Sequence, residues 1–321
     1  MIVAITGGTG FVGRRLVQRH LARGDEVRVL SRRAPPGVGL PASLRWCLGD
    51  LAAAGDLGHF VDRADVLYHC AGELRDASRM EAVHVEGTRR LIEATSGTVR
   101  RWVQLSSVGV YGQPRDGRVT ERSPLQPRGT YEITKKTSDA LVQAAGLKEA
   151  FEWVILRPSI VFGEDMPNQS LYQLVRAIDR GWFFFIGKPG AAANYIQADN
   201  VAHALTMCGV MPTAKGRIYN LSDHATLEDF VGMIAAALGK PSPRFRIPEP
   251  IARATAGVGS MLSARFPLTR SRVDAMTTRV QYPIDAIQAE LGYAHEVALE
   301  AGMSRLVHAW LAQQRIQLRR N

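Results

Sequence analysis

The pair Tyr131 and Lys135 has the residue types and the spacing of an acid/base site. The two residues lie four positions apart, so on a helix both side chains project from one face. A lysine ammonium lowers the pKa of a neighbouring phenol and can also hold a ribose, which would make Tyr131 a general acid or base for carbonyl or carbinol chemistry. The same spacing arises by chance in many helices, so a second motif is needed to support the assignment.

A glycine-rich segment, Thr6–Gly13, directly follows the strand-like run Ile2–Ile5. The glycines at positions 7, 10 and 13 allow a tight turn, close approach of the backbone to a pyrophosphate, and close packing of a helix on a strand. The first turn of that helix offers free N–H groups and the positive end of the helix dipole. The pattern predicts a dinucleotide-binding loop rather than an ordinary turn. Its expected contact residues are Gly7, Thr9, Gly10, Phe11, Val12 and Gly13.

The residues after the second and third strand-like runs indicate which cofactor is bound. Where an NAD-binding chain usually has an acidic residue for the ribose 2′-hydroxyl, this chain has Ser31, Arg32 and Arg33. Two guanidinium groups suit a 2′-phosphate, so NADP(H) is favoured and NAD(H) is the alternative. The arginines could instead be solvated surface residues. Asp50 and Leu51 are candidates for an adenine contact, although Asp50 could equally cap a helix.

These motifs need a scaffold that brings the ends of several strands together. Apolar runs end in glycine or polar residues, and segments with helical spacing separate most of them. The runs are Ile2–Ile5, Glu26–Leu30, Val66–His69, Trp102–Leu105 and Trp153–Leu156. This alternation predicts an α/β fold with a Rossmann-type doubly wound parallel sheet covered by helices on both faces. We expect a dinucleotide-binding domain over residues 1–165, rejoined by about 193–222, and a smaller, interleaved substrate-binding region formed by 166–192 and 223–321.

Further motifs follow one another in a fixed order along the chain. They are Leu105–Gly112 (LSSVGVYG), Arg157–Gly163 (RPSIVFG), His84–Thr88, Tyr195–Ala202 and Tyr219–Leu221. Together with the glycine-rich loop and the Tyr131/Lys135 pair, this order closely resembles the extended short-chain dehydrogenase/reductase family. That family includes NAD-dependent epimerases and dehydratases and a 3β-hydroxysteroid dehydrogenase-like branch. The resemblance covers essentially the whole chain.

The resemblance implies roles for particular residues. Ser107 would hydrogen-bond the substrate oxygen, Tyr131 would donate or accept the proton, and Lys135 would contact both the nicotinamide ribose and Tyr131. It also implies that several residues lie against the cofactor. These are Cys70, Ala71, Gly72, Pro158 and Ile160.

Departures from the family pattern bear on the substrate. His84 stands where asparagine is commonest, and we interpret it as a structural replacement rather than a catalytic histidine. Ala193 stands where sugar-nucleotide epimerases usually carry an arginine for the substrate diphosphate, which weakens the epimerase hypothesis. Asn168 lies in a segment similar to one that holds a nucleotide-sugar in epimerases, or it terminates a turn. Arg270 and Arg272 are candidates to bind a diphosphate, with solvated surface charge as the alternative.

Composition excludes several classes of protein. The 321 residues are 46% hydrophobic and 22% charged, which is typical of a globular chain. The net charge is +10, but the arginines are scattered and no reading motif accompanies them, so nucleic acid is not an expected partner. The three cysteines follow no metal-ligand spacing, so no metal site is expected and a cytoplasmic location fits. No apolar run reaches the ~20 residues of a membrane span, while residues 254–264 could form a lid or an interfacial helix.

The leading hypothesis is an NADP(H)-dependent oxidoreductase that transfers hydride between nicotinamide and a small secondary alcohol or ketone, without a metal. The first alternative is a sugar-nucleotide epimerase or 4-keto-sugar-nucleotide reductase. The second is a non-catalytic nucleotide-binding scaffold, which would have no need of the general acid in the set Ser107, Tyr131 and Lys135. A homodimer is compatible with the sequence.

Overall fold

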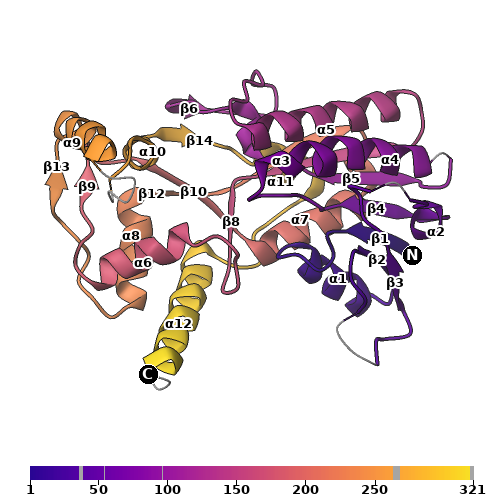
Figure 1. Ribbon diagram of the computed structural model, residues 1–321, viewed down its shortest axis with the longest axis horizontal. Coiled ribbons are helices and arrows are strands. Elements are labelled where there is room, and N and C mark those ends of the chain that lie inside the picture. The colour runs from indigo at the N-terminus through magenta and orange to yellow at the C-terminus, as the bar shows by residue number, and fades with distance from the viewer. Residues whose placement is uncertain (36–38, 54, 96, 263–267, 319–321) are drawn as a thin grey trace.

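A computed structural model describes residues 1–35, 39–53, 55–95, 97–262 and 268–318, with the side chains of all of these except 257–262 and 316–318. Within those residues, seven parallel strands form the largest sheet (Figure 1). In order across the sheet they are β11 (Arg217–Leu221), β7 (Glu152–Pro158), β5 (Arg101–Leu105), β4 (Val66–His69), β1 (Ile2–Thr6), β2 (Glu26–Ser31) and β3 (Leu44–Leu48). The doubly wound α/β fold expected from the sequence is confirmed.

Alternate residues of the central strands face opposite helical layers. In β1, Val3 and Ile5 pack in one core with Leu16 of α1, whereas Ala4 belongs to the core on the other face. Because both faces are buried, these strands are continuous apolar runs in the sequence. Figure 1 shows α1 (Gly13–Ala22) and α7 (Ala198–Val210) below the sheet, and α4 (Gly87–Ala94) and α5 (Thr130–Leu147) above it. The short elements α2 (Gly58–Val61), α3 (Ala77–Met80) and the π-helical turn η1 (Glu81–Glu86) lie on the α4 and α5 side.

The direction in which the chain builds the sheet changes between β1 and β4. From β1 the chain adds β2 and β3 on one side, then returns to add β4, β5, β7 and finally β11 on the other. In such sheets a crevice opens at the carboxyl ends of the strands beside this switch point. The loops after β1, β4 and β5 therefore meet at one edge.

A second, smaller sheet extends from the end of β7. After Ser159 the chain continues as β8 (Ile160–Phe162), which pairs in parallel with β10 (Ala192–Gln197), and β10 pairs antiparallel with β12 (Asp223–Thr226). Within residues 193–222, which were expected to rejoin the dinucleotide-binding part, β11 pairs with β7, whereas β10 lies in this separate sheet. The reason is that β8 already runs beyond the central sheet and offers β10 a partner there.

The remaining elements form a second core around the smaller sheet. Phe162, Phe230 and Met303 are buried in it, between α6 (Ser170–Asp179), α8 (Leu227–Ala237) and α12 (Leu299–Leu318). Two short parallel pairs join β9 (Phe185–Ile186) to β13 (Arg246–Ile247) and β6 (Asp116–Arg118) to β14 (Arg279–Gln281). The others are η2 (Val108–Tyr111), η3 (Pro212–Ala214), α9 (Glu249–Leu262), α10 (Arg270–Ala275) and α11 (Asp285–Leu291).

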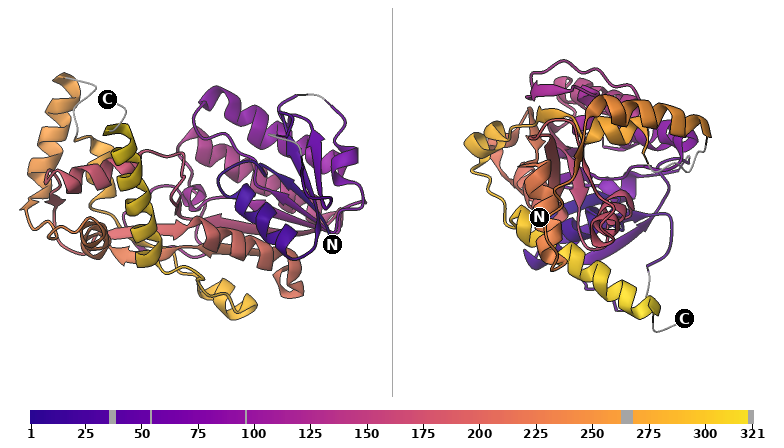
Figure 2. Two further views of the ribbon diagram at one scale, coloured as in Figure 1. Left: turned by 90° about the horizontal axis from the view of Figure 1, so that it is seen from below. Right: turned by 90° about the vertical axis from the view of Figure 1, so that its left-hand side faces the viewer.

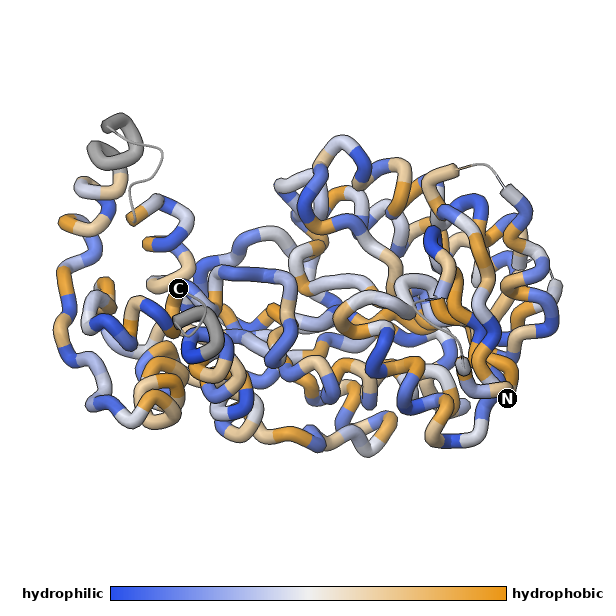
Figure 3. Tube along the Cα trace, turned by 60° about the horizontal axis from the view of Figure 1, so that its bottom comes forward, coloured by the Kyte–Doolittle hydropathy of each residue, from blue (hydrophilic) through white to orange (hydrophobic). Residues whose placement is uncertain are grey.

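The molecule is elongated, with the central sheet at one end and most of the C-terminal elements at the other (Figure 2). In Figure 3 hydrophobic residues follow the central strands at the right. Residues 254–262, expected as a lid or interfacial helix, belong to α9, while residues 263 and 264 and the side chains from 257 onward lie outside the described part. No helix in the described part of the chain is long and apolar enough to cross a membrane.

Candidate active site

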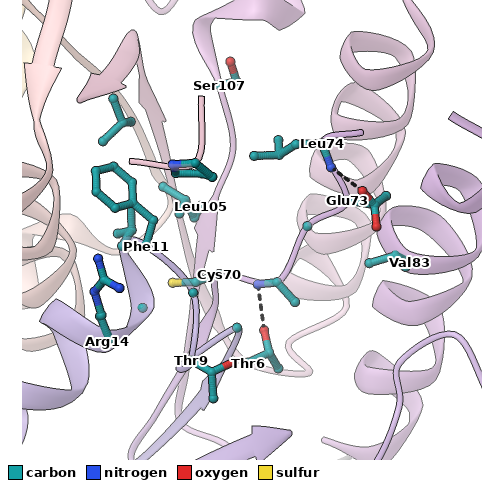
Figure 4. A pocket seen from close by; sticks show the side chains of 18 of the residues that line it. Thr6, Thr9, Phe11, Arg14, Cys70, Glu73, Leu74, Val83, Leu105 and Ser107 are labelled. Carbon is teal, nitrogen blue, oxygen red and sulfur yellow. Dashed lines mark hydrogen bonds between the residues drawn. The ribbon is translucent and has the colours of Figure 1, made fainter. Parts of the chain in front are cut away.

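A cavity of about 770 Å³ opens at the carboxyl ends of the central strands, beside the switch point between β1 and β4. Figure 4 shows how loops from separate strands line it. Thr9 and Phe11 come from the loop after β1, Cys70 follows β4, and Ser107 follows β5. The hydroxyl of Thr6 accepts a hydrogen bond from the N–H of Ala71 at 3.1 Å, which ties the loop after β4 to the end of β1.

The glycine-rich loop is built for close approach of backbone to ligand. Gly7 has φ +67°, and a Cβ added there would lie 2.7 Å from the carbonyl oxygen of Cys70. A Cβ on Gly13 would lie 2.1 Å from the carbonyl oxygen of Gly7, so α1 starts directly against the loop. The first turn of α1 carries no acidic residue and no side-chain cap, and it lines the cavity. The positive end of the α1 dipole therefore fits a dinucleotide pyrophosphate.

The two candidate 2′-phosphate ligands are placed differently. The Ser31 hydroxyl donates to the carbonyl oxygen of Arg33 at 2.9 Å and accepts from its N–H at 3.2 Å, which closes a turn after β2. This turn brings Arg32 to the cavity, while Arg33 does not line it. Neither guanidinium forms an ion pair within the described chain, so the positive charge of Arg32 stays available to an anion. Asp50 also lines the cavity, and its carboxylate accepts the N–H of Ala52 at 2.9 Å in a local turn.

Ser107, Tyr131 and Lys135 converge on the same cavity. The Ser107 hydroxyl accepts from the N–H of Gly109 at 3.1 Å and is hydrogen-bonded to Tyr131. Burial raises the pKa of Tyr131 to about 12, and the bond to Ser107 acts in the opposite direction. Lys135 is buried, and its ammonium donates to the carbonyl oxygen of Leu105. The lowering of the Tyr131 pKa expected from Lys135 does not occur in this structure, because burial dominates and the ammonium is bonded to β5 instead.

A buried ion pair between Asp139 and Arg157 connects the elements around Ser107, Tyr131 and Lys135. Asp139 lies one turn after Lys135 on α5, and its Oδ2 accepts from Arg157 at 3.1 Å and from the Ser106 hydroxyl at 2.8 Å. Arg157 also donates to the Tyr111 hydroxyl at 3.0 Å. Asp139 and Arg157 are almost fully buried. The pair therefore joins β7 to α5, which carries Tyr131 and Lys135, and to the end of β5, which Ser107 follows.

His84 lies behind Tyr131 and does not line the cavity. Its Nε2 accepts from the N–H of Glu73 at 2.8 Å, and its Nδ1 lies 2.8 Å from the Thr134 hydroxyl. Because that hydroxyl donates to the carbonyl oxygen of Thr130 at 2.9 Å, it accepts from Nδ1. Both ring nitrogens are thus satisfied in the neutral form, and burial lowers the pKa of His84 to about 4.

The structure brings most of the residues predicted for the site to this cavity. Those that line it are Gly7, Thr9, Gly10, Phe11, Val12, Gly13, Ser31, Arg32, Asp50, Leu51, Cys70, Ala71, Gly72, Ser107, Tyr131, Lys135, Pro158, Ile160 and Asn168. Arg33, Arg270 and Arg272 do not. α10 begins at Arg270 and packs on α9, and Arg272 donates to Gln173 of α6 at 2.9 Å, so this helix belongs to the other end of the molecule.

Sequence reasoning missed several lining residues. Arg14 follows the third glycine and pairs with Asp165, and its position in the first turn of a nucleotide-binding helix was the signal that could have identified it. Asp165 also bonds Arg15 at 2.9 Å. Leu74 and Val83 add an apolar wall. They lie in a loop and in a π-helical turn, where no periodic pattern marks them.

Comparisons with known proteins agree with this geometry. The model of the NAD dependent epimerase/dehydratase family matches residues 3–222. A 4-hydroxy-2-methyl-3-oxo-4-farnesyl-3,4-dihydroquinoline-1-oxide ketoreductase from Stigmatella aurantiaca is 30% identical over 97% of both chains.

Two solved structures share the fold. One is a short-chain dehydrogenase/reductase superfamily protein from Agrobacterium tumefaciens with bound NAD, at TM-score 0.76 and 22% identity over all of both chains. The other is a UDP-glucuronic acid 4-epimerase from Bacillus cereus in complex with NAD, at TM-score 0.75 and 18% identity over 98% of this chain and 99% of that one. The family expected from the sequence motifs is thereby confirmed: the chain belongs to the NAD dependent epimerase/dehydratase family.

Proposed function

We propose that the protein is an NADP(H)-dependent oxidoreductase that interconverts a ketone and a secondary alcohol carrying no nucleotide. The observation that carries this proposal is the convergence of Ser107, Tyr131 and Lys135 on a cavity that also contains the glycine-rich loop. Proton transfer to a carbonyl oxygen requires a positioned proton donor, and the hydroxyls of Ser107 and Tyr131 lie beside a cavity that is large enough for a dinucleotide.

The side chains around the cavity have separate roles in the proposed reaction. A nicotinamide cofactor, when bound, supplies the hydride in reduction and accepts it in oxidation. In reduction, the Ser107 hydroxyl holds the substrate oxygen and Tyr131 gives that oxygen its proton; in oxidation, Tyr131 removes the proton. A pKa of about 12 keeps the phenol protonated at neutral pH, which suits the reductive direction. Lys135, one helical turn from Tyr131, would hold a ribose hydroxyl of the bound cofactor.

The preference for NADP(H) rests on Arg32. Arg32 lines the cavity just beyond the end of β2, and its guanidinium forms no ion pair with any described residue. An unpaired guanidinium at this place favours a phosphate on the adenosine ribose over a free hydroxyl.

The residue at position 193 favours a substrate without a nucleotide. Ala193, at the place where an arginine would be needed, is buried in the apolar core of the smaller part. The nearby arginines are engaged elsewhere: Arg246 pairs with Glu228 and Arg279 donates to the carbonyl oxygens of residues 188 and 189. The ketoreductase relative supports a carbonyl substrate.

The test is to identify the nucleotide retained on purification by mass spectrometry and then to follow NADPH absorbance with panels of ketones, steroids and nucleotide-sugars. Reduction of a nucleotide-free ketone at a rate that responds to Tyr131→Phe supports the proposal. Turnover of nucleotide-sugars alone overturns it.

An epimerase or sugar-nucleotide reductase is the second candidate, and Asn168 favours it because this residue lines the cavity. Titration of the NADPH-loaded protein with UDP and dTDP separates the two. Micromolar binding that is strongly weakened by Asn168→Ala would place the second candidate first, because Asn168 lines the cavity and Arg270 and Arg272 do not.

A further inference from the structure

Two large aromatic side chains are exposed at the end of the molecule farthest from the central sheet. Trp182 is 66% exposed and Phe245 is 67% exposed. They precede the paired strands β9 and β13, which lie with α9 at the left-hand end of Figure 1. We propose that this end of the protein binds reversibly to the surface of a membrane that contains anionic lipids. The proposal does not depend on the reaction catalysed.

Phe245 immediately precedes β13 and Trp182 lies three residues before β9, so both residues come before the same end of this parallel strand pair. Phe185 pairs in register with Arg246, and the N–H of Phe185 donates to the carbonyl oxygen of Phe245 at 2.9 Å. The Phe245 ring lies 6.4 Å from the ring of Phe184, which packs against the small core beneath α9. Phe245 is therefore held on a packed base and directed outward. We call Arg180, Trp182, Phe184, Arg244 and Phe245 the tip surface.

Trp182 has the surroundings of an interfacial residue. The backbone N–H of Trp182 donates to the carbonyl oxygen of Ala177 at 2.8 Å, which fixes the turn at the end of α6. The guanidinium of Arg180 lies 4.9 Å from the centre of the indole ring. Tryptophan concentrates at the boundary between lipid and water, because its ring is apolar and its N–H is polar. A guanidinium beside it can reach lipid phosphates at the same depth.

Ion pairing leaves this end positively charged. Lys240 pairs with Asp179 at 2.7 Å, Arg246 with Glu228 at 2.5 Å, and Arg253 with Glu249 at 2.7 Å, so these acidic groups are neutralised. Arg180 and Arg244 are exposed and form no ion pair with any described residue. Their charge favours an anionic surface as the partner.

A second copy of the chain is a weaker candidate for covering the tip surface. In a two-fold symmetric contact the same patch appears on both subunits. The unpaired Arg180 and Arg244 would then face the same arginines of the partner copy, with no unpaired acid on this surface to offset them. Each cation near an anionic bilayer instead strengthens binding about fivefold.

The experiment is sedimentation of the full chain with vesicles of phosphatidylcholine containing phosphatidylserine, and with vesicles of phosphatidylcholine alone. We expect binding to the anionic vesicles that weakens with added salt, and much weaker binding to the neutral ones. Trp182→Ala/Phe245→Ala should weaken binding at least about tenfold, because two apolar contacts are lost. Arg180→Gln/Arg244→Gln should weaken it about 25-fold.

Matched variants on the far side of the molecule provide the controls. Leu147 is 79% exposed at the end of α5, so Leu147→Ala removes an exposed apolar side chain elsewhere. Lys136→Gln/Lys148→Gln removes two exposed charges from the same region. Both controls should bind vesicles as the wild type does. The proposal fails if the wild type does not sediment with anionic vesicles, if control and tip variants behave alike, or if the tip variants instead convert a dimer to a monomer in size-exclusion chromatography with light scattering.

Discussion

The imidazole of His84 stands edge-on against the ring of Tyr131, with the ring centres 5.6 Å apart and the planes at 81°. The same imidazole accepts from the N–H of Glu73, beside the cavity wall, and contacts Thr134 one turn along from Tyr131. One buried side chain thus links the loop after β4 to Tyr131 on α5, the proposed proton donor. His84 is a positioning residue, because it reaches the cavity only through its neighbours.

Removing that link should impair turnover more than cofactor binding. We expect His84→Ala to lower kcat about 10- to 100-fold, since small displacements of a catalytic group have effects of this size, with at most a small rise in the KM for NADPH. His84→Asn restores an amide able to accept from Glu73 and should recover most of the activity. Steady-state kinetics of both variants decide this, and equal kcat values for His84→Ala and the wild type would contradict the role.

The neutral state of His84 also predicts how stability depends on pH. Its pKa is about 4 in the folded protein and near 6.5 when unfolded. Below pH 6.5 the unfolded chain takes up a proton that the folded chain does not, so this contribution is complete above 6.5 and is lost as the pH falls toward 4. Between pH 7.5 and 5 the loss from this residue is roughly 2 kcal/mol. Urea unfolding at both pH values should show a smaller drop for His84→Asn, and identical drops would disprove the assignment.

Tyr131→Phe should abolish most of the turnover while leaving the cofactor site intact. The change removes only the hydroxyl, and a positioned acid or base supplies about 10²–10⁴-fold in rate. Kinetics and NADPH titration of the same preparation give the two readouts. Wild-type turnover in this variant would favour the non-catalytic scaffold.

Alanine variants of Arg32 and Arg33 form a matched pair that tests the preference for NADPH over NADH. Because only Arg32 lines the cavity, Arg32→Ala should weaken NADPH binding by roughly 1.5–3 kcal/mol, the value of a charged hydrogen bond, and should leave NADH binding unchanged. Arg33→Ala should have little effect. Calorimetric titration with both nucleotides tests this, and equal losses in the two variants would show that the turn after Ser31 presents both side chains.

The local features of the site could be predicted from the sequence, whereas features that depend on contacts between distant segments could not. The glycine-rich loop and Ser107 each follow a strand, and Tyr131 and Lys135 lie on one face of a helix. Spacing along the sequence is therefore enough to place all of them near the carboxyl ends of the central strands. The pairing of β10 with β8 depends on where the chain leaves the central sheet, which no local pattern records. The orientation of Arg33 depends on hydrogen bonds from Ser31 and Trp46, residues that spacing does not connect to it.

Arg270 and Arg272 illustrate a second limit. Their charge suits a diphosphate, but charge says nothing about where a helix packs. α10 rests on α9, and Arg272 reaches α6.

The single residue between β7 and β8 limits how this protein can be rebuilt. Pro158 ends β7 of the central sheet and Ile160 begins β8 of the smaller sheet, yet both residues line the same cavity. A chimera that exchanges the C-terminal region cannot be cut between the two sheets without also exchanging part of the cavity wall. Grafted substrate regions should therefore be joined beyond Asn168, so that the donor of the glycine-rich loop also provides residues 159–168.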